Sequence, residues 1–230
     1  MIPWVHIDTA KVPGGGEDLR LMRRGSEFAI MLGSSSLMNS RLSGSEEALS
    51  TLTIERLLEK ANPHILIGGL GMGFTLRAAL DVLPPEARVT VSELVPAVVA
   101  WARGPMAEIF GGSMNDPRTD VREVDVRALI RSARATYDAI LLDVDNGPEG
   151  LTKTANDSLY SGTGLNAAHA ALRPGGILAV WSQGPDEHFT RRLGKAGFEV
   201  EVVRVRASRA KRGARHVIWL ARKAPVPKAQ

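Results

Sequence analysis

The chain has 230 residues, with 29 Lys and Arg against 25 Asp and Glu, and it contains no cysteine. This length is enough for one sizeable α/β domain with a small appendage. The absence of cysteine excludes disulfides, zinc–thiolate sites and thiol catalysis. Charges and prolines interrupt every apolar stretch, so we expect no span of the ~20 apolar residues that a bilayer requires. The N-terminus lacks the pattern of a signal peptide, and we expect a cytoplasmic protein.

The formal net charge is +4, and six basic residues lie between Arg204 and Arg215. A basic segment can indicate a nucleic-acid partner. A solvated hairpin with a basic loop explains the same residues without one. We therefore expect no nucleic-acid partner.

Residues 1 to about 42 are rich in turn formers. Short strands are predicted at 19–23 and 27–32, joined by a hairpin turn at 24–26. We interpret residues 1–44 as a small β-hairpin appendage. A helix is expected over residues 45–58, with Ser43 or Ser45 as its cap.

From residue 63 the pattern changes to alternating strands and helices. Strands are predicted at 64–67, 88–93, 120–124, 137–142 and 177–181, with helices at 75–83, 96–103, 126–132, 164–172 and 189–196. Two final strands, 198–205 and 216–221, are expected to form a hairpin. Strands separated by helices indicate a parallel sheet covered on both faces. We therefore expect a Rossmann-like domain over 45–223, closed by an antiparallel strand, and a disordered tail over 224–230.

A glycine-rich turn follows the first strand of this domain and precedes a helix. It contains Gly68, Gly69, Gly71 and Gly73. Glycine permits tight turning and lets the backbone approach a ligand without an intervening Cβ. The position favours nucleoside binding, although glycine turns also serve plain packing.

Glu93 ends the second strand about 20 residues after the turn. An acidic residue at this spacing can accept hydrogen bonds from both ribose hydroxyls. A surface glutamate is the alternative. NAD is a lesser candidate ligand, because the strict G-x-G-x-x-G order is missing and no dehydrogenase-like second domain follows.

Asp125 follows the third strand. Its carboxylate is a candidate acceptor for an adenine amino group, with Val126 or Leu94 packing on the ring. The alternative is a helix N-cap for residues 126–132, a position that aspartate favours.

Asp143 and Asp145 follow the fourth strand, at the carboxyl edge where open parallel sheets bind ligands. Two carboxylates there could hold a cationic amine and take its proton as it attacks an electrophilic carbon. They could also favour a sulfonium donor electrostatically. A polar loop without a ligand role would have a similar composition.

Trp181 and Gln183 end the fifth strand on the same edge. Gln183 is a candidate for orienting an amine, and Trp181 for walling the pocket, although a core tryptophan is an equal alternative. The five histidines lack metal-ligand spacing, so we expect no metal.

These motifs together resemble the spermidine/spermine synthase (polyamine aminopropyltransferase) family, within the class I S-adenosylmethionine-dependent methyltransferase fold. The resemblance implies Asp143 as the acid–base carboxylate, with Asp145 beside it, Glu93 at the ribose and Asp125 at the adenine. It also implies Glu46 and Tyr160 on the acceptor side, and a homodimer. The segments that carry it are Gly68–Gly73 with Leu76–Arg77, Glu93, Asp125, Tyr137–Asp143, Leu159–Tyr160, Arg173–Gly176 and Gln183.

The chain departs from the family pattern at the donor and acceptor ends. The glycine turn has Leu70 and Met72 where the family carries an aspartate, and the tyrosine expected after Glu46 is Leu49. Three functions therefore stay open: aminopropyl transfer from decarboxylated S-adenosylmethionine to a small amine, methyl transfer from S-adenosylmethionine, and nucleoside binding without turnover.

Overall fold

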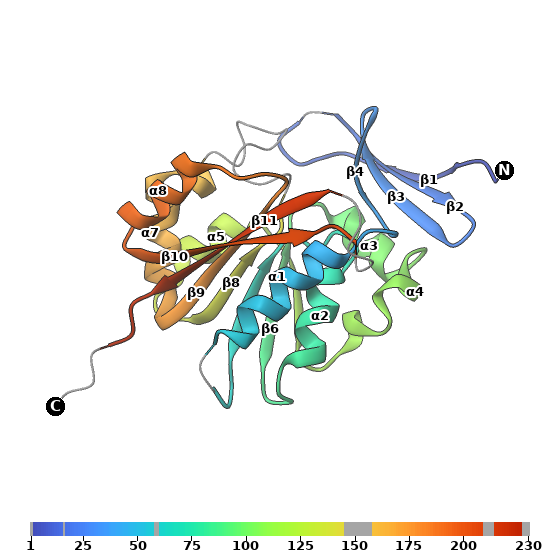
Figure 1. Cartoon of the computed structure of the whole chain (residues 1–230). Helices are drawn as coiled ribbons and strands as arrows, with labels where there is room; N and C mark the ends of the chain where they lie inside the picture. The colour runs from blue at the N-terminus through green and yellow to red at the C-terminus, as the bar shows by residue number, and fades with distance from the viewer. Residues whose placement is uncertain (1, 16, 58–59, 145–157, 209–213, 227–230) are drawn as a thin grey trace.

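A seven-stranded sheet forms the centre of the protein in the computed structural model, which describes all residues except 1, 16, 58–59, 145–157, 209–213 and 227–230 (Figure 1). The strand order is β10-β11-β9-β8-β5-β6-β7, and only β11 runs antiparallel to its neighbours. The mostly parallel sheet with an antiparallel strand is thus confirmed. The strands are β5 (His64–Gly68), β6 (Arg88–Glu93), β7 (Thr119–Glu123), β8 (Tyr137–Leu142), β9 (Leu172–Ser182), β10 (Phe198–Arg206) and β11 (Arg215–Lys223).

Helices cover both faces of this sheet because its strands are apolar on both sides. Ile65 and Ile67 of β5 face one hydrophobic cluster, while Leu66 faces the other. Burying each such side chain contributes roughly 1.5–3 kcal/mol. The first face carries α1 (Gly44–Glu55), α2 (Phe74–Val82) and α3 (Pro96–Arg103), and the second carries α5 (Val126–Ser132), α7 (Gly162–Ala171) and α8 (Glu187–Lys195). None of the helices in the described ranges is long and apolar enough to cross a membrane.

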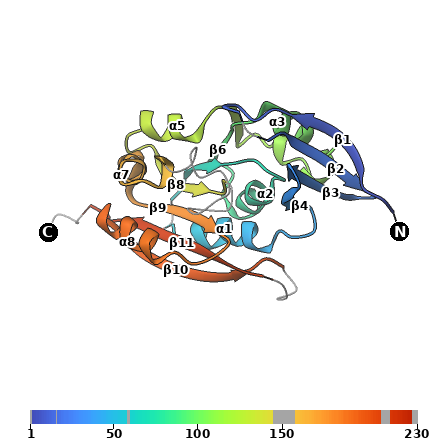
Figure 2. The same ribbon diagram turned by 90° about the horizontal axis from the view of Figure 1, so that it is seen from above.

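The N-terminal β appendage is confirmed, and its predicted hairpin, β2 with β3, lies within a four-stranded antiparallel sheet. Its strands are β1 (Val5–Ala10), β2 (Leu19–Arg24), β3 (Glu27–Leu32) and β4 (Ser35–Asn39). The two outer strands escape sequence analysis because β1 is almost fully exposed and β4 begins with serines. Figure 2 shows this sheet at the opposite end of the molecule from the C-terminus.

The N-terminal sheet is fixed to the larger sheet by apolar and polar contacts. Leu21 and Ile30 are buried in the same cluster as α1 and α2. The indole Nε1 of Trp101 in α3 donates a 2.7 Å hydrogen bond to Asp8 Oδ2 in β1. The two sheets therefore share one core.

Several predicted boundaries are confirmed and others shift. The elements α3, α5, β6 and β8 begin and end at the predicted residues, whereas α1 ends at Glu55. Ser43 precedes α1 as its N-cap but makes no capping hydrogen bond through its side chain. The short α4 (Ala107–Phe110) and the 3-10 helix η1 (Ser113–Asn115) were not predicted.

A buried carboxylate holds together the amino edge of the sheet, opposite the candidate site. Asp138 in β8 is fully buried and pairs with Lys60 and Arg173, and it accepts a 2.9 Å hydrogen bond from the His64 backbone N–H. Burial opposes the charged form, but these donors outweigh it and hold the pKa of Asp138 below its ordinary value. Its stabilising effect is therefore present at neutral pH and is lost as pH falls below about 4.

Replacing Asp138 by Asn should lower the free energy of unfolding by about 2–3 kcal/mol at pH 7, because hydrogen bonds to a buried charge are lost. Urea denaturation measures this. The matched control is Asp120→Asn, since Asp120 pairs with Arg122 at the surface with both side chains about half exposed; its effect should stay under about 0.5 kcal/mol. Equal effects of the two variants would contradict the structural role of Asp138.

Candidate active site

In the glycine turn between β5 and α2, the positions of Gly69 and Gly73 are packed too closely for any larger residue. Gly69 has φ of +93°, and a Cβ there would lie 2.5 Å from the carbonyl oxygen of Asp143. Gly73 has φ of +75°, and its Cβ would lie 2.3 Å from the Phe110 ring. Left-handed backbone and close neighbours both require glycine.

Two further glycines bring other elements against the same turn. A Cβ on Gly68 would lie 3.0 Å from the side chain of Val126, the first residue of α5. A Cβ on Gly71 would lie 3.0 Å from Met38 Sδ in β4. The start of α5 and the N-terminal sheet therefore flank the turn on two sides.

Glu93 joins the end of β6 to this turn. Its carboxylate accepts 2.9 Å hydrogen bonds from the backbone N–H groups of Leu70 and Val95, one on each oxygen. The residue is only 8% exposed, so it is not the surface glutamate of the alternative interpretation. Burial raises the pKa of Glu93 even though backbone N–H groups stabilise its charged form.

Asp125 caps helix α5, as the structural alternative predicted. Its carboxylate accepts a 2.8 Å hydrogen bond from the Arg127 backbone N–H and also pairs with the Arg127 guanidinium. An adenine contact for Asp125 remains a prediction. Val126 is buried beside the glycine turn, whereas Leu94 is 40% exposed after β6.

Asp143 follows β8 on the face of the sheet that α1 and α2 cover. The Thr75 hydroxyl of α2 donates a 2.8 Å hydrogen bond to Asp143 Oδ2. The Asp143 backbone N–H donates to the Gly68 carbonyl at 3.0 Å, which ties the carboxylate to the base of the turn. Burial raises the pKa of Asp143 above its ordinary value.

Glu46, in the first turn of α1, forms an electrostatic pair with Asp143. Burial and the negative charge of Asp143 together raise the pKa of Glu46 to about 7. Helix α1 is held in place because Ser50 donates a 2.6 Å hydrogen bond to the Thr75 carbonyl. Two neighbouring acids with raised pKa values are typical of sites that bind a cation and accept its proton.

Two residues that sequence analysis missed adjoin Glu46. The Ser45 hydroxyl donates a 2.6 Å hydrogen bond to Glu46 Oε2, and His216 Nδ1 lies 2.9 Å from Ser45 Oγ. His216 and Trp181 make an edge-to-face contact with 4.8 Å between ring centroids. His216 lies in β11, and β11 reaches α1 only in the folded protein. No local sequence signal therefore connects His216 to α1.

The other residues predicted to bind the acceptor do not all lie beside Glu46 and Asp143. Tyr160 is 2% exposed and packs on Phe189 in the hydrophobic cluster of the opposite face. Gln183 is exposed at the end of β9. Asp145 lies outside the described residues. Trp181 is 8% exposed, and its Nε1 has no hydrogen-bond partner among the described residues.

A hollow of about 750 Å³ lies away from these groups, over the N-terminal sheet. Trp4, Arg24, Phe28 and Leu42 are among its lining residues. It contains neither Glu46 nor Asp143, and its lining lacks paired acids. The carboxyl edge of the larger sheet remains the candidate for chemistry.

The sheet order, the turn after β5 and the acid after β6 define the fold of class I S-adenosylmethionine-dependent methyltransferases. Within that class the predicted resemblance is confirmed, since the chain is similar to curated polyamine aminopropyltransferases. It is 33% identical over 135 residues to the enzyme of Korarchaeum cryptofilum and 36% identical over 132 residues to polyamine aminopropyltransferase 1 of Streptomyces coelicolor. These matches cover 58% and 54% of this chain.

The same matches cover 40% and 23% of the two relatives, so the similarity concerns less than half of each. No family model matches the chain. Among solved structures, a spermidine synthase from Thermotoga maritima superposes with a TM-score of 0.75 at 17% identity, over 97% of this chain and 74% of that one. A spermidine synthase in complex with the transition-state analogue AdoDATO gives 0.74 at 17% identity, with the same coverage.

The variant Gly69→Ala should destabilise the protein by more than the matched variant Gly112→Ala. Both positions have positive φ, but a Cβ at Gly112 meets nothing within 4 Å. Gly112→Ala should therefore lower the free energy of unfolding by about 1–2 kcal/mol from backbone strain alone, and Gly69→Ala should add the overlap with Asp143. Urea denaturation compares them. A smaller loss in Gly69→Ala would show that the turn is not tightly packed.

Glu46 should titrate near pH 7, and Asp143→Asn should lower its pKa while leaving it above 4.5, since burial persists. Carboxyl ¹³C NMR follows the titration. The free energy of unfolding should fall as pH rises from about 4.5 through 7, because the folded protein holds a proton that the unfolded chain has released. The Glu46→Gln variant should lose that part of the pH dependence. An unshifted Glu46 would contradict the acid pair.

Proposed function

We propose that the protein is a transferase that moves an aminopropyl group from decarboxylated S-adenosylmethionine to a small amine. The observation that carries this proposal is a pair of half-buried acids beside the glycine turn, Glu46 and Asp143, with the Thr75 hydroxyl in contact with both residues. The similarity to polyamine aminopropyltransferases supports the same reaction.

The donor nucleoside is expected to lie across the glycine turn. The backbone there approaches its surroundings without side chains, and Glu93 stands at the neighbouring strand end. The Glu93 carboxylate accepts hydrogen bonds from the backbone N–H groups of Leu70 and Val95, and those of Gly71 and Leu94 also stabilise its charged form. In this proposal the ribose hydroxyls approach the same carboxylate and share it with these backbone donors.

The acceptor amine enters the reaction as an ammonium ion and must lose a proton before it attacks. Asp143 and Glu46 attract the cation, and Asp143 accepts its proton. The amine nitrogen then forms a bond to the carbon next to sulfur, the carbon–sulfur bond breaks, and its electron pair stays on sulfur. Methylthioadenosine leaves.

Methyl transfer from S-adenosylmethionine is the second candidate, because the turn lacks the aspartate of the family pattern and so does not select the decarboxylated donor. Leu70 and Met72 are buried in the core, so the turn offers no carboxylate for the amine of a decarboxylated donor. Arg77, a candidate partner for a donor carboxylate, instead donates a 2.7 Å hydrogen bond to the Ile109 carbonyl. Neither donor tail therefore has a charged side-chain partner in this turn.

A small amine acceptor, a cytoplasmic location and a homodimer complete the proposal. The two outer strands of the N-terminal sheet, β1 and β4, have free edges that a second copy could pair with. A basic surface does not repel a cationic acceptor when the cleft itself holds two acids.

Calorimetry with S-adenosylmethionine and its decarboxylated form, followed by product analysis with putrescine as acceptor, tests the donor. We expect tighter binding of the decarboxylated form and formation of methylthioadenosine. S-adenosylhomocysteine as the product, with a suitable acceptor, would establish methyl transfer instead. Binding without any product would leave a nucleoside-binding protein, and no binding of either donor would overturn all three functions.

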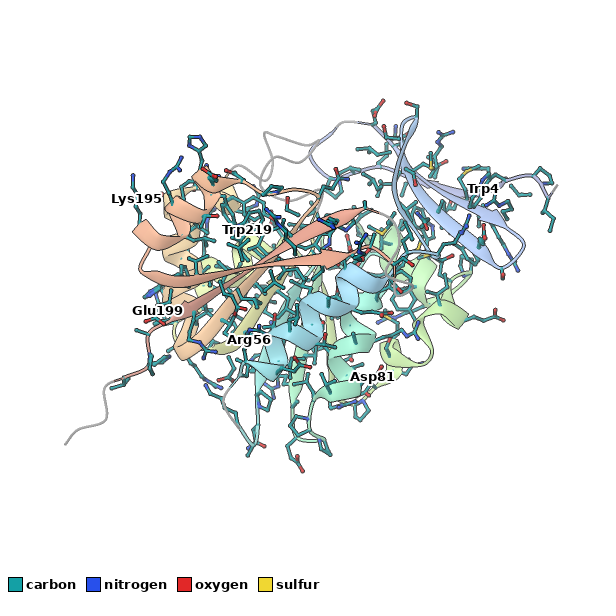
Figure 3. All side chains as sticks on the ribbon, in the orientation of Figure 1. Trp4, Arg56, Asp81, Lys195, Glu199 and Trp219 are labelled. Carbon is teal, nitrogen blue, oxygen red and sulfur yellow. The ribbon has the colours of Figure 1, made fainter. Side chains whose placement is uncertain are left out.

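The Asp143→Asn variant should lower kcat by about 10²–10⁴-fold with unchanged donor affinity, because it removes the base and keeps the shape of the side chain. The control is Asp81→Asn, at the end of α2 far from the glycine turn (Figure 3), which should keep full turnover. Full turnover in Asp143→Asn would exclude Asp143 as the base.

A further inference from the structure

We infer that Ser45 and His216 form a proton relay that leads from Glu46 out of the acid pair. This inference rests on the proposed function and deepens it. It adds two positioning residues, on α1 and β11, that neither the motifs nor the resemblance pointed to.

The relay consists of two short contacts in series. Ser45 Oγ lies 2.6 Å from Glu46 Oε2 and 2.9 Å from His216 Nδ1. Ser45 is fully buried, whereas His216 is only partly buried. The chain of contacts therefore begins at the inner acid pair and ends at a group that water can reach.

The sheet places His216 on the correct face for this role. Trp181 pairs with Ile218 across β9 and β11, and His216 is two residues from Ile218, so it points to the face that α1 covers. The Trp181 ring packs against the edge of His216 and fixes its orientation. Helix α1 contacts β8, β9, β10 and β11, and thus places its first turn over this face.

The hydrogen-bond chain has two directions, set by the protonation of Glu46. A serine hydroxyl carries one proton. When Glu46 is ionised, Ser45 donates to it and accepts from Nδ1–H of His216. When Glu46 is protonated, it donates to Ser45, which donates to an unprotonated Nδ1. In passing to this state the Nδ1 proton moves through Ser45 to Glu46, and Nε2 takes up one proton from water. Reversal of the chain transfers a proton between Glu46 and the outer nitrogen of His216.

The surroundings keep this exchange near neutral pH. Burial raises the pKa of Glu46 most, and the charges of Asp143, which follows β8, and Glu47 in α1 raise it further. The Thr75 hydroxyl from α2 approaches the Glu46 carbonyl at 3.4 Å. His216 faces Ser45 and Trp181, and burial lowers its pKa, so its ring is neutral when Glu46 titrates.

The proposed reaction supplies a proton for such a relay. An ammonium acceptor and a sulfonium donor give a secondary ammonium product, a neutral thioether and one released proton. Asp143 takes this proton from the amine and shares it with Glu46. Ser45 and His216 then return it to water, and the pair is reset for the next acceptor.

The tautomer of His216 tests the relay without any turnover. Imidazole ¹⁵N NMR, assigned with His216→Gln, should show Nε2–H below pH 7 and Nδ1–H above it. The inflection should vanish in Glu46→Gln and in Ser45→Ala. One tautomer at every pH, or an inflection that persists in Ser45→Ala, would overturn the relay.

Turnover provides the second arm. Ser45→Ala and His216→Gln should lower kcat about tenfold, less than the loss of the base itself, with unchanged KM and donor affinity. Added imidazole should restore turnover to His216→Ala. The control is His188→Gln, on the exposed part of α8, which should match the wild type. Unchanged kcat in both relay variants, or a loss with no rescue and weakened donor binding, would assign Ser45 and His216 a structural role only.

The two arms separate the relay from the proposed function. A wild-type protein that forms no product from either donor, yet shows the tautomer inflection, has the relay but another activity. A wild-type protein that forms methylthioadenosine but lacks the inflection has the activity without the relay.

Discussion

The electrostatic coupling of two neighbouring acids, Glu46 and Asp143, is the constraint on which the rest of the site depends. Neither carboxylate ionises easily there, because burial penalises the charge of each, and the charge of Asp143 also opposes that of Glu46. A bound cation would relieve this repulsion, and the proposed acceptor amine supplies one. Two hydrogen bonds stabilise this arrangement. Thr75 donates one to Asp143, and Ser50 donates the other to the Thr75 carbonyl, which holds α1 against α2.

The glycine turn forms the second part of the candidate site, beside the acid pair. Its glycines are packed from four directions, by Asp143, Phe110, Val126 and Met38, and these neighbours leave little room for side chains at the glycine positions. This packing brings the tips of β5, β6 and β8 close together. In the proposed function, a nucleoside over the turn has its ribose near Glu93 and its sulfur end near the acids.

The N-terminal sheet contributes directly to the structure around the candidate site. Its apolar face is buried in the same core as α1 and α2, and Met38 closes one side of the turn. Helix α1 follows β4 in the chain and carries Ser45 and Glu46 in its first turn. Weakening the N-terminal sheet should thus affect the acid pair through the position of α1.

The sequence by itself determined the strand–helix alternation, the mostly parallel sheet, the glycine turn and the placement of Glu93 and Asp143 at strand ends. These features are local, since periodicity, turn residues and spacing along the chain encode them. Even so, β1 and β4 went unpredicted because edge strands that face water lack an apolar pattern.

Only the tertiary structure decided which acids act together and what adjoins them. Glu46 and Asp143 are almost a hundred positions apart, and Ser45 and His216 are further apart still, so their contacts depend on how α1 lies across the sheet and how β11 inserts beside β9. The tertiary structure also showed that Asp125 caps a helix and that Tyr160 packs in the opposite core. Electrostatic coupling and burial arise from three-dimensional proximity, and a linear pattern carries no record of either.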